Sequence, residues 1–270
     1  MEFRTIVDIG KAGFEVQPCE EMLFVGSCFA DEMGKRFKDE GFPVVANPYG
    51  VMYNPASILH TIEKYEGKAR VVFLTLGTNH VFRLKETGEI VDNCEKRPQK
   101  LFREEELTVD ECADYLQRAI SLLKNRRPDV QVVLTVSPIR YRKYGYHESQ
   151  VSKATLLLAV SRLTSDLSPL TSYLYYFPAY EIMMDELRDY RFYAADMLHP
   201  SQQAVDYIWE RLVDWCFSKE AKAYLDEWRP LKQTLAHRPF APESEEYRAL
   251  MDKTMLKVAE LRKKYSNFAL

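Results

Sequence analysis

The chain has 270 residues, of which 46% are hydrophobic and 29% charged, a composition typical of a folded domain rather than a disordered or fibrous chain. Its 37 basic and 40 acidic side chains leave a net charge of −3, so we expect no nucleic-acid partner bound by electrostatics. The longest apolar run, 154–160, is far shorter than a membrane span, and charges interrupt the N-terminal stretch where a signal peptide needs apolar residues. We therefore expect a cytoplasmic protein without a membrane span.

Apolar runs bounded by turn residues alternate with helical patterns along most of the chain. The expected strands are 22–25, 43–46, 71–75, 131–136 and 173–177, and the expected helices follow them at 29–37, 58–65, 113–124, 151–167 and 201–217. Continuous apolar strands separated by helices indicate a parallel sheet covered on both faces. The sequence therefore predicts a three-layer α/β/α sandwich around a five-stranded parallel sheet, in which ligands bind beyond the carboxyl ends of the strands.

Two segments fall outside this alternation. Residues 81–110 form an insertion after the third strand, with an expected hairpin of 81–84 and 89–91 that is placed to act as a lid. Residues 219–270 have helical patterns and form an expected C-terminal appendage or dimer element. We thus expect a catalytic domain over 1–218 with a helical extension over 219–270, as a monomer or a homodimer.

The five cysteines are odd in number and widely spaced: Cys19, Cys28, Cys94, Cys112 and Cys216. No CxxC or Cys/His ligand pattern is present, so we expect neither a disulfide framework nor a metal site, and no cofactor. Cys28 is expected to be a buried apolar residue rather than a nucleophile.

Ser27 lies where the first strand runs directly into a helix, within the sequence Gly-Ser-Cys-Phe-Ala. A serine at such a turn stands at the carboxyl edge of the sheet, beside the free N–H groups and positive dipole end of the helix. It is placed to attack a carbonyl, with its own N–H helping to hold the oxyanion. A plain N-cap serine is an equally common reason for this residue.

Asp196 and His199 immediately precede the helix 201–217. A carboxylate three residues before an imidazole can fix the tautomer of the ring and stabilise its cation. Pro200 biases His199 away from the helical conformation, so that its ring can project into a cleft. Either residue alone favours a structural role, as a helix-start charge or a surface histidine. Together with Ser27 on the same sheet edge, they predict a nucleophile, a base and an orienting acid.

Other loops at this edge supply further candidates. Gly50 offers an uncrowded N–H and Asn79 a side-chain amide as oxyanion donors, although Asn79 is equally a loop-capping residue. Asn47 or Asn54 is expected to cap the helix that follows, and His80 either faces the cleft or caps the insertion. Cations and rings alternate over 140–147, which suits an anionic or sugar ligand but also a solvated basic loop. The candidate substrate contacts are Asn47, Tyr49, Tyr53, His80, Arg140 and Tyr141.

Aromatic residues are abundant, with 17 Tyr, 14 Phe and 3 Trp. Tyrosine rings suit a groove for a polar ligand such as a sugar, because each buried hydroxyl needs a hydrogen-bond partner. Seven tyrosines lie in segments at or near the reactive edge and are expected to line a pocket around the nucleophile: Tyr49, Tyr53, Tyr141, Tyr144, Tyr146, Tyr190 and Tyr193.

The pentapeptide at 26–30 resembles the motif of the GSCFA family, which is similar to the SGNH (GDSL-like) hydrolases. Further segments that resemble the family are 47–55, Gly77-Thr78, Asn93-Cys94, 137–140 and 190–201. The resemblance implies a flavodoxin-like sheet, Ser27 as nucleophile, Gly50 and Asn79 as oxyanion donors, and Asp196 with His199 as the Asp-x-x-His block. The superfamily pattern continues with Asp after this asparagine, where the chain has His80.

The residues favour a serine hydrolase or acyltransferase acting on an O-acyl ester, such as an acetyl group on a carbohydrate. The alternative is a catalytically silent carbohydrate- or nucleotide-binding module on the same scaffold. A third hypothesis, a scaffold protein that acts through its helical tail, depends only on residues 219–270.

Overall fold

The computed structural model describes residues 3–92, 97–165, 170 and 172–269. Within them the predicted five-stranded parallel sheet is present, with the order β2-β1-β3-β7-β8. The strands are β1 (Met22–Gly26), β2 (Val44–Ala46), β3 (Val71–Leu76), β7 (Gln131–Val136) and β8 (Leu174–Tyr176). β1 and β3 lie in the interior of the sheet, so the segments that follow them meet at the middle of its carboxyl edge.

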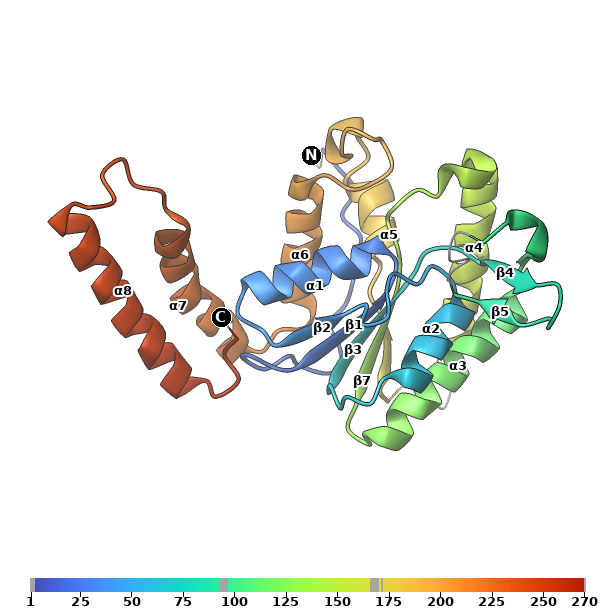
Figure 1. Cartoon of the computed structure of the whole chain (residues 1–270), viewed down its shortest axis with the longest axis horizontal. Helices are drawn as coiled ribbons and strands as arrows, with labels where there is room; N and C mark the ends of the chain where they lie inside the picture. Colours follow the sequence, from blue (N-terminus) through green and yellow to red (C-terminus); the bar gives the residue numbers. More distant parts are fainter. Residues whose placement is uncertain (1–2, 93–96, 166–169, 171, 270) are drawn as a thin grey trace.

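Helices cover both faces of the sheet, as predicted (Figure 1). One face carries α1 (Cys28–Asp39) and α6 (Gln202–Cys216), with the short α5 (Ala179–Glu181) beside them; the other carries α2 (Pro55–Lys64), α3 (Val109–Arg126) and α4 (Gly145–Leu163). Alternate strand residues enter the two cores: Phe24 stacks on Phe73 at 4.6 Å between ring centroids on the α1 face, whereas Leu23 and Leu74 pack on the α2 face.

α3 and α4 start four and six residues earlier than the periodicity predicted, and α2 starts three residues earlier. α3 begins at Val109 because Thr108 and Glu111 form a capping box, in which each side chain accepts a hydrogen bond from the backbone N–H of the other. α4 begins at Gly145, six residues before the expected start, and ends at Leu163 rather than at 167. The first turns of α3 and α4 are mostly polar, so the sequence there has no apolar repeat that predicts a helix.

The insertion forms a second sheet of the order β5-β4-β6. The predicted hairpin is present as β4 (His80–Leu84) and β5 (Ile90–Val91), and the return strand β6 (Phe102–Glu106) pairs antiparallel with β4 after the 3₁₀ turn Gln99–Leu101. β6 was not predicted, because its residues are mostly charged. The family-like pair Asn93-Cys94 lies outside the described residues.

The C-terminal residues form a helical hairpin of α7 (Lys219–Ala236) and α8 (Glu245–Lys264), which lies to one side of the sheet (Figure 1). The Tyr224 hydroxyl donates to the carbonyl of Glu40 at 2.6 Å, and Lys232 pairs with the Glu40 carboxylate at 2.9 Å. α7 is thereby fixed to the end of α1. No helix in the described part of the chain is both long and apolar enough to cross a bilayer.

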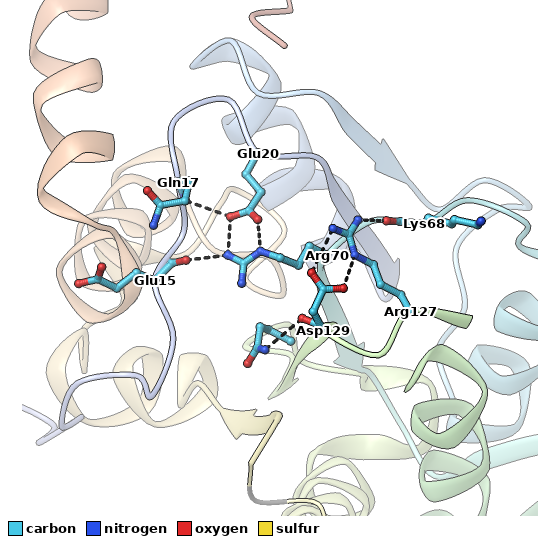
Figure 2. A network of polar contacts seen from close by, with 8 residues as sticks. Glu15, Gln17, Glu20, Lys68, Arg70, Arg127 and Asp129 are labelled. Atoms are coloured by element: carbon cyan, nitrogen blue, oxygen red, sulfur yellow. Dashed lines mark hydrogen bonds and ion pairs between the residues drawn. The ribbon is translucent and has the colours of Figure 1, made fainter. Parts of the chain in front are cut away.

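A polar network fixes the amino-terminal edge of the sheet (Figure 2). Arg70, directly before β3, pairs with Glu20 before β1, and its Nη2 donates to the Glu15 carbonyl at 2.7 Å. Arg127 pairs with Asp129 at 2.9 Å just before β7. The Arg70–Glu20 pair joins the starts of β1 and β3, and Arg127 also donates to the Lys68 carbonyl, which joins the start of β7 to the segment before β3. This network lies at the edge opposite the candidate site.

Candidate active site

The turn between β1 and α1 is tightly constrained around Ser27. Gly26 has a φ of +140°, and a Cβ at this position would lie 2.0 Å from the Thr75 carbonyl oxygen, so only glycine fits. The Ser27 N–H donates to that carbonyl at 3.1 Å and to Thr75 Oγ1 at 2.9 Å. The end of β3 therefore holds the serine in place.

The Ser27 hydroxyl is the N-cap of α1 and accepts a hydrogen bond from Phe29 N–H at 3.3 Å. It also lies 3.1 Å from Thr75 Oγ1, and the residue is only 2% exposed. The N-cap role is thus present in the structure. It leaves the hydroxyl at the carboxyl edge of the sheet, and capping and nucleophilic attack are compatible because the cap uses the oxygen as an acceptor only.

Asn47 acts as a clamp on this turn. Its backbone has a φ of +41°, its Oδ1 accepts from Gly26 N–H at 2.8 Å, and its Nδ2 donates to Asp31 at 2.7 Å. Its carbonyl accepts from Gly50 N–H at 2.9 Å. Asn47 therefore joins the serine turn to the loop of Gly50, and Asn54, not Asn47, is the cap of α2.

Asp196 and His199 form a hydrogen-bonded pair, with 2.5 Å between Asp196 Oδ2 and His199 Nδ1. Asp196 Oδ1 accepts from the backbone N–H groups of His199 and Leu198, at 3.0 and 2.8 Å. These amide bonds, with the imidazole, hold the pKa of the Asp196 carboxyl well below its usual range. The carboxylate is therefore ionised and fixed, and Nδ1 of His199 is set to carry a proton toward it.

The helices that follow Ser27 and His199 pack against each other. Arg36, about two turns into α1, contacts Asp206, about one turn into α6, at 3.4 Å. Just before α6, the Leu198 carbonyl accepts from the N–H of Arg140, which follows the carboxyl end of β7, at 3.1 Å. Both helices therefore start at the same sheet edge. Among the described residues no hydrogen bond joins Ser27 to His199, whose side chain is 43% exposed.

The predicted oxyanion donors all have partners within the chain. Ser27 N–H donates to Thr75 and Gly50 N–H to Asn47, as described above. The buried Asn79 donates through Nδ2 to the Leu107 carbonyl at 2.8 Å, while its Oδ1 has no hydrogen-bond partner in the described part of the chain. To bind an oxyanion, these N–H groups would have to share their hydrogen bonds with it or give up their present acceptors.

Lys153 is a buried residue at this edge that the sequence analysis missed. Its Nζ donates to the carbonyls of Gly77 and Ser137, both at 2.8 Å, which directly follow β3 and β7. Burial lowers the pKa of Lys153 to about 7. Its neighbour Ser152 accepts a hydrogen bond from Asn79 N–H at 3.0 Å, so α4 supports the loop after β3. The available signal was a lysine on the apolar face of its helix.

Three of the predicted tyrosines form a continuous chain of ring contacts with His80, which we call the ring stack. Tyr144 and His80 are stacked with 20° between their planes, whereas the other two pairs are tilted by 44° and 46°. Ring centroids are 5.9 Å apart for Tyr53 and Tyr141, 5.5 Å for Tyr141 and Tyr144, and 3.8 Å for Tyr144 and His80. The Tyr53 carbonyl accepts from Gly77 N–H at 2.9 Å. Burial lowers the pKa of His80, which favours a neutral, stacking imidazole.

The prediction of a buried Cys28 is wrong. The residue is half-buried, and its Sγ lies 3.5 Å from the Tyr53 hydroxyl, because the first residue of α1 faces the loop that carries Tyr53. Tyr49 lies apart from the other rings: it is 49% exposed, and its hydroxyl donates to the Lys64 carbonyl. Tyr146, Tyr190 and Tyr193 surround Arg140 instead.

Solved structures with similar folds cover most of the chain. A protein from Streptococcus pneumonia assigned as a platelet activating factor has a TM-score of 0.50 and 19% identity, over 74% of this chain and 84% of its own. A catalytic mutant of an acetylxylan esterase from Geobacillus stearothermophilus has a TM-score of 0.49 and 13% identity, over 76% and 100%. A GDSL-like lipase from Bacteroides thetaiotaomicron has a TM-score of 0.45 and 15% identity, over 74% and 89%.

No curated protein matches the sequence. The profile of the GSCFA family matches residues 21–69 and 61–212, and that of the C-terminal domain of GSCFA domain proteins matches 228–270. These matches include Ser27, Asn79, Asp196 and His199, and the chain belongs to the GSCFA family.

Proposed function

We propose that the protein is a serine-dependent ester hydrolase or acyltransferase that acts on O-acyl esters through an acyl-enzyme on Ser27. The observation that carries the proposal is the fixed Asp196–His199 pair, at 2.5 Å, at the start of the helix that packs beside the helix capped by Ser27. A hydroxyl, an imidazole and an ionised carboxylate at one sheet edge are the groups that acyl transfer requires.

In this mechanism Ser27 Oγ attacks the ester carbonyl carbon while His199 Nε2 takes the hydroxyl proton. The tetrahedral intermediate collapses, the ester C–O bond breaks, and His199 returns the proton to the leaving alcohol. Water, or the hydroxyl of an acceptor, then attacks the acyl-enzyme as His199 removes its proton, which yields a carboxylic acid or a new ester and restores Ser27. Asp196 keeps the imidazole in the required tautomer.

The intermediate's negative charge needs N–H donors at the edge. We assign this role to Ser27 N–H, Gly50 N–H and the Asn79 amide, whose present acceptors the substrate oxygen would replace or share. Cys28 N–H, in the first turn of α1, has no acceptor within the described residues and points to a further donor. The ring stack of Tyr53, Tyr141, Tyr144 and His80 would supply a face for a sugar ring.

The 2% exposure of Ser27 and its missing hydrogen bond to His199 favour a second candidate, a catalytically silent binding module on the same scaffold. The two are separated by labelling with a fluorophosphonate, followed by mass spectrometry, and by turnover of p-nitrophenyl acetate. An esterase is labelled at Ser27 and loses both signals in Ser27→Ala and His199→Ala, but not in the exposed control Ser165→Ala. Labelling and turnover that persist in both site variants would exclude Ser27 as nucleophile, and neither signal in the wild type would favour the binding module.

A further inference from the structure

Arg140, which follows β7, lies against three tyrosine rings, of which Tyr193 is buried and Tyr146 and Tyr190 are exposed. Its guanidinium carbon lies 4.3 Å from the ring centroid of Tyr193 and 5.6 Å from those of Tyr190 and Tyr146. Tyr146 belongs to α4, whereas the other two come from the 3₁₀ turn Tyr190–Phe192 and the residue after it. Side chains from separate segments therefore hold one cation; we call Arg140 and these rings the tyrosine cage.

The tyrosine cage is joined to the catalytic loop by backbone hydrogen bonds. Arg140 N–H donates to the carbonyl of Leu198 at 3.1 Å, one residue before His199. Ala194, next to Tyr193 in the chain, donates its N–H to the His199 carbonyl at 2.8 Å. The tyrosine cage and the loop that carries His199 are therefore neighbouring parts of the same sheet edge.

A cavity of about 320 Å³ opens beside the cage. Its walls include Arg140, Arg188, Tyr190 and Tyr193 over an apolar floor of Met183 and Leu187.

Neither arginine forms an ion pair within the described residues, whereas one wall carboxylate, that of Asp189, is already paired with Arg191 at 3.7 Å. The second wall carboxylate, Asp185, is exposed. A guanidinium has five N–H donors, and the side chains of Tyr193 and Tyr190 also hydrogen-bond that of Arg140. The remaining N–H donors of Arg140 are available to a ligand.

We propose that the tyrosine cage is a subsite for an anionic group of the acylated substrate, a carboxylate or a phosphate, so that the preferred substrate is an ester of an acidic sugar. This inference rests on the proposed esterase function. Arginine matches both anions because its planar fork binds two oxygens at once, and the flanking tyrosine rings hold the fork in one orientation.

The experiment compares kcat/KM for three acetylated probes that carry the ester on the same hydroxyl: methyl glucuronide, methyl glucoside and methyl glucoside 6-phosphate. The wild type should prefer at least one anionic probe to the neutral one by roughly ten-fold or more. Arg140→Gln should abolish this ratio and Arg140→Lys should retain part of it. Arg142→Gln, which removes the same charge from an exposed neighbour, should keep it.

A wild type that hydrolyses all three probes equally would overturn the proposal, as would an equal loss of preference in Arg140→Gln and Arg142→Gln. A binding experiment tests the subsite even if the esterase function fails. The Ser27→Ala protein is titrated with unacetylated methyl glucuronide and methyl glucoside 6-phosphate, and binding is followed by NMR shifts. Binding that is lost in the Ser27→Ala, Arg140→Gln double variant supports the subsite without catalysis. No binding of either anion refutes it, and the preferred probe distinguishes carboxylate from phosphate.

Discussion

Replacing Lys153 by methionine tests how burial changes the charge of the amine that joins the loops after β3 and β7, and how this charge affects stability. The residue is 2% exposed, and its Nζ donates to the carbonyls of Gly77 and Ser137 at 2.8 Å each. No carboxylate pairs with it in the part of the chain that the structure describes. Burial lowers its pKa from 10.5 to about 7, so in the folded protein the amine loses its proton as the pH rises through neutrality.

The sign of the effect follows from proton binding. Between pH 7 and 10.5 the unfolded chain keeps the Lys153 proton while the folded protein releases it, so the contribution of this residue to stability rises with pH. From pH 7 to 9 this contribution increases by about 2 kcal/mol. Lys153→Met lacks the increase, and at both pH values it also leaves two buried carbonyls without donors, at about 1–3 kcal/mol each.

Urea unfolding at pH 7 and pH 9 measures this difference, with the exposed Lys35→Met as the matched control. The destabilisation caused by Lys153→Met should be about 2 kcal/mol larger at pH 9 than at pH 7, while the control should show no such change. Equal destabilisation at the two pH values would show that Lys153 titrates alike in the folded and unfolded states, and would refute the reasoning that burial controls its charge.

Three further changes test the turn and the dyad. Gly26→Ala should reduce the free energy of unfolding by at least about 3 kcal/mol, since its Cβ would meet the Thr75 carbonyl. The control Gly10→Ala, with open space around it, should change this free energy by no more than about 0.5 kcal/mol. Equal effects of the two substitutions in urea unfolding would contradict the clash. Asn47→Ala should lower stability by about 1–3 kcal/mol in the same assay, because it removes the acceptor of Gly26 N–H, and an unchanged midpoint would argue against the clamp. Asp196→Asn should lower kcat for p-nitrophenyl acetate by about 10⁴-fold with the melting temperature little changed, and full activity would remove Asp196 from the mechanism.

The central sheet was predictable because each of its strands is a short apolar run bounded by turn residues, and both faces of the sheet are buried. β6 was not, since Phe102 is its only fully buried residue and the rest of the strand is charged. Its pairing depends on partners distant in sequence, such as Arg83 of β4, which binds Glu105 at 2.9 Å. Such a strand is stabilised by cross-strand contacts that no local pattern contains.

The same distinction between local and distant partners separates the predicted site residues from the missed ones. Ser27, Asp196 and His199 were predicted as site residues because each motif lies next to the helix that positions it. Thr75 and Lys153 were missed, since they act across the fold: Thr75 from the neighbouring strand and Lys153 from a helix that reaches the carbonyls after two strands. Lysine on a buried helix face is rare enough that its spacing with buried Leu156 and Val160 was an available signal.

Six of the seven tyrosines predicted near the reactive edge form two groups with different chemistry, the ring stack and the tyrosine cage. The ring stack ends at His80 in β4 of the insertion, and Lys143, next to Tyr144, pairs with Glu104 of β6 at 2.7 Å. The tyrosine cage of Arg140 is instead joined by backbone hydrogen bonds to the loop of His199. A ring stack presents faces suited to a neutral sugar, and an arginine edge is suited to an anion. Both groups take residues from the segment 140–146 after β7, but only the ring stack contains a residue of the insertion, His80. Changes in the insertion should therefore alter recognition of the sugar ring while leaving the preference for charge at Arg140 in place.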